Sequence, residues 1–228
     1  MKKHLFSAIA LFMMLGSFAS LQGQAVRNGV ERAQDRNQIQ NGQEIIQRDR
    51  GEIRQFVANR KGMYAAIEDG KPGLAKGYHA KLISGMEREV NQGKAKIAQS
   101  NREVNQSRSE VRSSNREVRN TRNTGRPIAT ADDRRDRRDD QRDLQDDKAD
   151  RAELIRRNNR QQEILNIFRA VKVDGPGDYA SIRAKRNLLD EFEQTMIRDM
   201  GENWEELNED KQELREDRRE TREDRRQR

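Results

Sequence analysis

The stretch NREVNQSRSEVRSSNREVRNT, residues 101–121, decides the fold because it divides into three seven-residue units of nearly one formula. Each unit has Glu before Val, then Asn or Arg, and ends in Ser or Thr. Because an α-helix has 3.6 residues per turn, a strict spacing of seven keeps one line of side chains facing a partner in a left-handed supercoil. The stretch therefore predicts a long helix that packs on another helix through a narrow seam.

The apolar line of this helix continues upstream at the same spacing. It consists of Ile83, Val90, Ile97, Val104, Val111 and Val118. With these residues at heptad position a, position d holds Ser100, Ser107, Ser114 and Thr121. A buried Val contributes about 1.5–3 kcal/mol at most, so one apolar column beside a hydroxyl column gives a weak seam. We expect this helix to need a partner along its length.

The composition agrees with long helices that have thin apolar seams. The chain is 38% charged, 32% hydrophobic and 4% aromatic, and Leu, Ile, Val and Phe together supply 34 of the 203 residues after Ala25. This apolar fraction is below what a globular core needs. However, the charges nearly balance and the sequence is periodic, and long helices need little core per residue. The predicted fold class is all-α, with coiled-coil-like heptad seams.

An internal duplication is suggested by three landmarks that recur about 100 residues apart. The stretch ELNEDKQELREDRRETREDRR, residues 206–226, is again three heptads and aligns with the opening stretch at a shift of 103. Upstream, DRGEI at 49–53 matches DRAEL at 150–154 at a shift of 101. The helix breakers at 69–73 and 174–177 match at a shift of 105, with Tyr78 and Tyr179 just beyond them. Coincidence in a Glu- and Arg-rich background is the alternative explanation.

The domain organisation that follows is two tandem helical hairpins. The first hairpin spans 26–123 with a turn near 69–73, residues 124–130 form a linker, and the second hairpin spans 131–228 with a turn near 174–177. The C-terminal helix is highly charged, and the charged ends are expected to fray.

Local signals support both turns. Gly70 suits the left-handed position after a helix, and Pro72 prevents the helix from continuing. In the second turn, Asp178 is expected to cap the following helix.

The N-terminal residues 1–25, MKKHLFSAIALFMMLGSFASLQGQA, have the pattern of a secretory signal peptide. Lys2 and Lys3 precede an apolar run, and small residues follow it. The run is short for a membrane span, although a retained anchor helix is the alternative. Cleavage is expected between residues 19 and 25. We therefore expect an exported protein without a transmembrane anchor, in the periplasm or outside a bacterial cell.

Carboxylates are plentiful in the chain, but the other residues and motifs typical of catalytic or metal sites are scarce. There is no cysteine, and His79 is the single histidine after residue 25. A zinc site usually needs several His or Cys ligands, and the turn sequences do not match a calcium loop or a phosphate-binding loop. The sequence predicts no enzymatic activity, no cofactor and no metal.

Three function classes remain. The first is a structural or protein-interaction module of the envelope, with a protein partner or self-association. The second is a polyanion-binding protein that uses the basic helix 88–122, with an envelope glycolipid or a nucleic acid as the partner. Residues 26–125 carry 20 Lys and Arg against 12 Asp and Glu, a net charge of +8. The candidate residues are Arg102, Arg108, Arg112, Arg116, Arg119 and Arg122.

The third class is a chaperone-like or stress protein of the periplasm. It would shield apolar segments of other proteins through the apolar patch at 182–204. The candidate residues of that patch are Leu189, Phe192, Met196, Met200 and Trp204.

Overall fold

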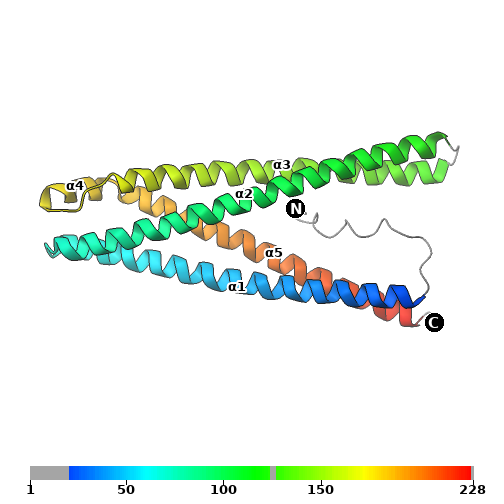
Figure 1. Ribbon diagram of the computed structural model, residues 1–228, viewed down its shortest axis with the longest axis horizontal. Coiled ribbons are helices and arrows are strands. Elements are labelled where there is room, and N and C mark those ends of the chain that lie inside the picture. Colours follow the sequence, from blue (N-terminus) through cyan, green and yellow to red (C-terminus); the bar gives the residue numbers. More distant parts are fainter. Residues whose placement is uncertain (1–20, 124–126, 227–228) are drawn as a thin grey trace. The chain divides into compact units, whose positions relative to one another are not determined.

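The computed structural model describes residues 21–123 and 127–226. It describes their side chains from Arg36 onward, except at residues 127–130, 132, 213, 216–217 and 220–226. Residues 1–20 of the proposed signal peptide lie outside the described residues. The described residues form five helices and no strand, so the all-α fold class is confirmed (Figure 1). The helices are α1 (Leu21–Glu68), α2 (Pro72–Asn123), α3 (Pro127–Arg169), α4 (Pro176–Ala184) and α5 (Arg186–Arg226).

The turn between α1 and α2 is closed by backbone hydrogen bonds. Gly70 has a φ of 64°, and its N–H donates to the Ile67 carbonyl at 3.2 Å. The Lys71 N–H donates to the Ala66 carbonyl at 2.8 Å, which completes a Schellman motif. The left-handed conformation expected of Gly70 is confirmed, and Pro72 begins α2.

Two helix starts differ from the sequence-based expectation. The N-cap of α4 is Gly175, not Asp178, and Pro176 takes the first helical position because its fixed φ suits that position. The Asp178 carboxylate instead accepts a hydrogen bond from the Asp174 N–H at 2.9 Å. Similarly, α3 begins at Pro127, so the expected linker is helical over residues 127–130.

The described residues form two compact units. The hairpin unit consists of residues 88–163, in which α2 and α3 lie side by side (Figure 1). The core unit consists of residues 21–87 and 164–226, so α2 and α3 each contribute to both units. The predicted division into two duplicated tandem hairpins stays a prediction.

The core unit holds most of the buried apolar side chains. Of the 22 buried hydrophobic residues among the described side chains, 20 belong to it. The Phe56 ring of α1 stacks on the Phe192 ring of α5, with 5.5 Å between centroids and 21° between planes. The Arg60 guanidinium joins the same two helices, because it pairs with Glu193 at 2.6 Å and also with Asp190.

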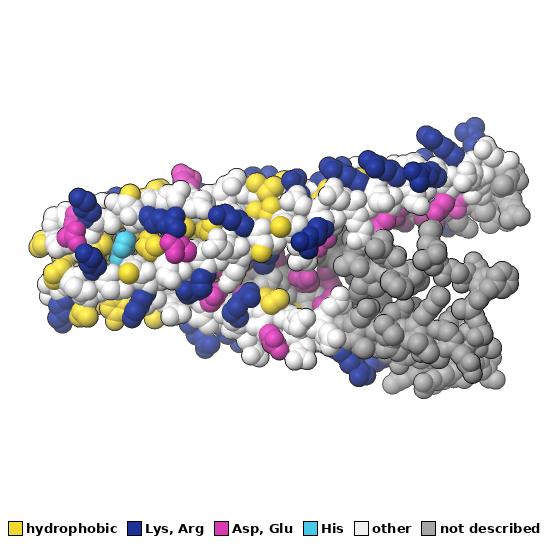
Figure 2. Space-filling model, in the orientation of Figure 1, with side chains coloured by type: hydrophobic (Ala, Val, Ile, Leu, Met, Phe, Trp, Pro, Cys, Tyr) yellow, Lys and Arg dark blue, Asp and Glu magenta, His cyan; other side chains and the backbone are white. Residues whose placement is uncertain are grey.

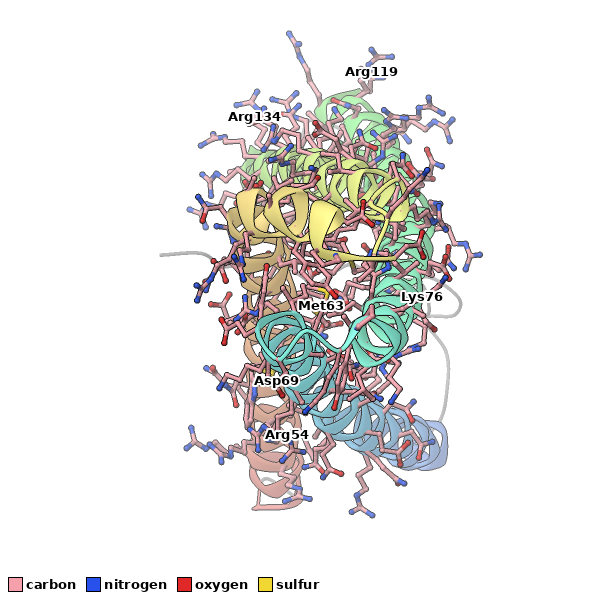
Figure 3. The ribbon with its side chains drawn as sticks, turned by 90° about the vertical axis from the view of Figure 1, so that its left-hand side faces the viewer. Arg54, Met63, Asp69, Lys76, Arg119 and Arg134 are labelled. Carbon is pink, nitrogen blue, oxygen red and sulfur yellow. The ribbon has the colours of Figure 1, made fainter. Side chains whose placement is uncertain are left out.

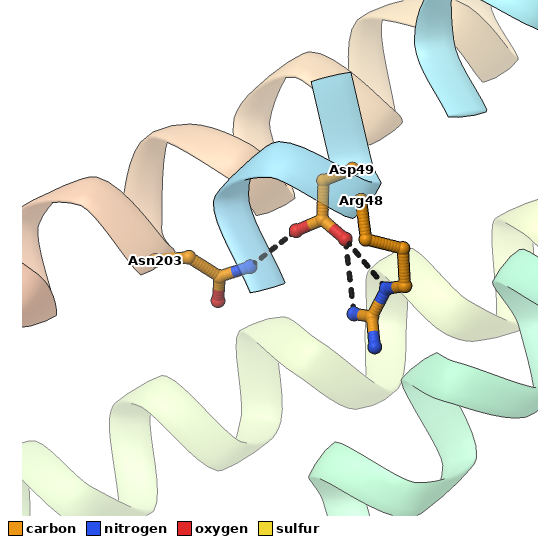
Figure 4. A network of polar contacts seen from close by, with 3 residues as sticks. All are labelled: Arg48, Asp49 and Asn203. Atoms are coloured by element: carbon orange, nitrogen blue, oxygen red, sulfur yellow. Dashed lines mark hydrogen bonds and ion pairs between the residues drawn. The ribbon is translucent and has the colours of Figure 1, made fainter. Parts of the chain in front are cut away.

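Helix α1 lies along α5 over much of its length and runs antiparallel to it (Figure 1). Further from the Phe56 pair, the Asn203 amide donates to the Asp49 carboxylate at 2.6 Å, and Arg48 contacts the other oxygen of that carboxylate (Figure 4). Near the turn, Gly62 of α1 lies against the Tyr78 ring of α2. The sequence analysis expected α2 as the partner of α1, whereas the structure gives α1 a longer contact with α5.

Candidate functional site

The interior of the hairpin unit is polar. Among the side chains that the structure describes, two buried hydrophobic residues, Val90 and Val104, belong to it, whereas seven of the nine buried polar or charged residues do. The seven are Glu89, Ser100, Ser107, Ser114, Arg157, Asn158 and Gln161. This unit is therefore held together mainly by polar contacts between α2 and α3.

Two serine–aspartate contacts with the same spacing join the helices. The Ser107 hydroxyl contacts the Asp147 carboxylate, and Ser114 contacts Asp140. Each hydroxyl also lies 3.0 Å from the carbonyl four residues earlier on α2. Because a carboxylate is the stronger acceptor, we assign the hydroxyl proton to the aspartate contact. Each pair is seven residues from the next on both helices, so together they fix an antiparallel register.

Amide side chains continue this polar seam toward the start of the unit. The Arg151 guanidinium donates to the Asn101 side-chain oxygen. The Asn158 amide donates to the Val90 carbonyl at 2.9 Å, and Gly93 leaves room for the Asn158 side chain. Each of these hydrogen bonds favours one alignment of α2 and α3, because another alignment would leave a buried or half-buried polar group unpaired and so destabilise the fold.

The sequence analysis missed the α3 side of this seam. Asp133, Asp140 and Asp147 are seven residues apart, and the series Arg137, Leu144, Arg151 and Asn158 has the same spacing. A search for heptads of polar residues would have found the aspartate series and, apart from Leu144, the second series. On α2, Val111 and Val118 are half-buried, and the left-handed supercoil itself stays a prediction.

The six arginines proposed from the sequence all lie exposed on α2 within the hairpin unit. They are Arg102, Arg108, Arg112, Arg116, Arg119 and Arg122. On the heptad wheel they occupy positions e, b and f, which are adjacent columns of one helix face. Figure 2 shows Lys and Arg side chains in dark blue along this part of α2 and α3. Figure 3 shows Arg119 of α2 and Arg134 of α3 pointing outward. We call the e, b and f columns of residues 101–123 the arginine face.

The three glutamates of the same stretch lie in column g, outside the arginine face, and accept hydrogen bonds from neutral side chains. Glu103 and Glu110 each accept a hydrogen bond at 3.0 Å from the glutamine four residues earlier, and Glu117 accepts one from Ser113 at 3.3 Å. Within the described part of the chain, none of the six arginines forms an ion pair. Arg108 donates to the neutral Asn105 side chain at 3.4 Å. The positive charges of this face are therefore available to a partner.

The second set of proposed residues lies on α5 in the core unit. Leu189, Phe192 and Met196 are buried, with exposed fractions of 0%, 0% and 3%. Met200 is half-buried, and Trp204 is 38% exposed with the Lys211 ammonium 5.9 Å from its ring centroid. The structure thus brings the first three of these residues together as core and leaves the Trp204 ring partly accessible.

His79 and Tyr64 are titratable residues of the core unit with perturbed pKa values. The His79 Nε2 atom lies 3.0 Å from the Phe168 carbonyl. Burial lowers the pKa of His79, and the hydrogen bond to Phe168 opposes this shift. Burial raises the pKa of Tyr64, against the opposing charges of Arg186 and Arg60. Both residues therefore favour their neutral forms inside the helical core.

Among the residues that the structure describes, no cluster of three or more His, Cys, Asp or Glu side chains is arranged to hold a metal ion. None of the described helices has a stretch of sufficient length and hydropathy to be a candidate membrane span. Comparison of the sequence and structure with protein families, curated proteins and solved structures gives no match.

Proposed function

We propose that the protein is an exported, non-enzymatic helical protein of the bacterial envelope that acts as a structural and protein-interaction module. The observation that supports this most is the contrast between its two units. The core unit gathers nearly all of the buried apolar side chains, whereas the hairpin unit presents long charged surfaces on a polar seam. Such an arrangement suits a protein that displays a surface.

Helix length supports a spacer role. Helix α2 has 52 residues, which corresponds to about 78 Å at 1.5 Å per residue. A helix of this length can hold interaction surfaces far apart with few apolar residues. The proposed absence of enzymatic activity rests on the sequence, which has no cysteine and, after residue 25, one histidine.

The chaperone-like alternative has less support. Its proposed client-binding patch includes Leu189 and Phe192, and both side chains are fully buried in the core unit. A client could reach them only if α5 moved away from α1. We therefore assign α5 a structural role in the core unit and not a role in client binding.

The test is site-specific photo-crosslinking in the native envelope. A photoreactive residue replaces Ala149, which is exposed on α3 of the hairpin unit, and in a second variant Arg54, which is exposed on α1 of the core unit. We expect a discrete protein adduct from the Ala149 position, which can be a second copy of the chain. Sequencing the N-terminus of the exported protein should show cleavage between residues 19 and 25. Absence of an adduct at both positions, or an uncleaved protein retained inside the cell, contradicts the proposal.

A further inference from the structure

We propose that the arginine face of α2 docks on a membrane surface rich in anionic phosphate headgroups. This inference goes beyond the proposed scaffold role and does not depend on a protein partner. It starts from six exposed arginines on one helix that form no ion pair within the described residues.

The composition of the arginine face is unusually uniform. Its eleven positions in residues 101–123 hold six Arg, four Asn and one Ser. The face has no carboxylate and no apolar residue, although the chain as a whole has 40 Asp and Glu. Arginine guanidinium groups and the exposed amides of Asn105 and Asn123 donate hydrogen bonds to phosphate oxygens, whereas Asn101 and Asn115 lie at the edge of the face and are half-buried. The face is therefore suited to phosphate groups rather than to an apolar ligand.

The spacing of the arginines gives the face its length. From Arg102 to Arg122 the helix advances about 30 Å, and a step of four residues corresponds to about 6 Å. A straight row of charges of this length can meet a flat anionic surface along its whole extent. Because the face lacks apolar side chains, it is expected to stay at the level of the headgroups without inserting.

A nucleic acid fits the same face less well. The face has no aromatic residue on which bases could stack. A duplex curves around its axis, so a helix face about 30 Å long would reach its phosphates over only part of its length, whereas a flat headgroup surface meets the whole face.

The experiment is co-sedimentation of the full exported chain with lipid vesicles. One set of vesicles is phosphatidylcholine alone, and the other is phosphatidylcholine mixed with phosphatidylglycerol. The test variant carries Arg108→Gln, Arg112→Gln, Arg116→Gln and Arg119→Gln. The matched control carries Arg50→Gln, Arg54→Gln, Lys61→Gln and Arg183→Gln, four exposed residues of the core unit. Gln retains helix propensity, and circular dichroism should show the same helicity for both variants.

We expect the unaltered chain to sediment with the anionic vesicles and to remain in the supernatant when only neutral vesicles are present. It should dissociate from the anionic vesicles as the salt concentration is raised. The test variant should bind at least about tenfold more weakly, while the control variant changes by less than about twofold. Equal losses in the two variants would show that net charge, not this face, causes binding. Equal binding to neutral vesicles, no binding to either kind, or tighter binding to a duplex DNA competitor would each overturn the proposal.

Discussion

The Ser107 hydroxyl of α2 donates to the Asp147 carboxylate of α3, and Ser114 repeats this contact with Asp140 one heptad away. The two pairs place a polar column where coiled coils usually have apolar side chains. Shifting one helix by a turn would separate each hydroxyl from its carboxylate. The pairs therefore specify the register of the hairpin unit at the expense of apolar burial.

The first prediction concerns the pair of Ser107 and Asp147. Ser107→Val removes the donor that the structure gives to the half-buried Asp147 carboxylate, so we expect the free energy of unfolding to fall by about 1–3 kcal/mol. Chemical denaturation followed by circular dichroism measures this change. Ser109→Val, at an exposed position of the same helix, is the matched control and should change it by less than about 1 kcal/mol.

The double variant Ser107→Val, Asp147→Leu tests the physical cause. Replacing both polar partners by apolar ones removes the unpaired buried group, so stability should return to the original value or exceed it. A double variant as unstable as Ser107→Val alone would show that the hydrogen bond is not the cause.

The second prediction concerns two glycines of α1. A Cβ atom at Gly62 would lie 2.6 Å from the Tyr78 ring, whereas one at Gly51 would meet nothing within 4 Å. Gly62→Ala should destabilise the core unit by about 1–3 kcal/mol through overpacking. Gly51→Ala should stabilise it by about 0.5–1 kcal/mol, because Ala is the better helix former. Thermal unfolding of the two variants should shift in opposite directions, and a shift of the same sign would contradict the packing at Gly62.

The third prediction separates core from surface on α5. Phe192 is fully buried and stacks on Phe56, so Phe192→Ala should lower the free energy of unfolding by about 3–5 kcal/mol. Trp204→Ala, at a partly exposed ring, should cost clearly less, about 1 kcal/mol. Urea denaturation of both variants provides the comparison. Equal effects would show that the 182–204 patch is not divided into core and surface as described.

The fourth prediction is a pH dependence carried by His79. The pKa of His79 is lowered in the folded state by burial, so below its ordinary value of 6.5 the unfolded chain binds the proton more readily. Stability contributed by neutral His79 is therefore present above pH 6.5 and is lost as the pH falls through the lower folded pKa. The denaturation midpoint should decline over that range.

His79→Gln is the variant that checks this assignment. Gln retains a donor for the Phe168 carbonyl but does not titrate, so the decline below pH 6.5 should become shallower. Lys81→Gln, at an exposed position of α2 two residues from His79, should leave the decline of the denaturation midpoint unchanged. An identical decline in His79→Gln and the unaltered chain would assign the pH dependence to other groups.

Sequence reasoning succeeded where the signal is local. The left-handed Gly70 followed from the residues around it, and the grouping of the arginines on one face followed from their spacing. It failed at Asp178, because Pro176 and Gly175 already supply a helix start. It also missed the column of Asp140 and Asp147, because the search for seams looked for apolar residues.

By itself, the sequence determined that this chain is all-α and where one of its turns closes, because periodicity, glycine and proline act on neighbouring residues. Only the tertiary structure decided which helices pair: α1 with α5 in the core unit, and α2 with α3 in the hairpin unit. The physical reason is that a repeat of seven marks which face of a helix is buried but not what covers it. That choice depends on side chains far apart in the chain, such as Phe56 with Phe192 and Ser107 with Asp147.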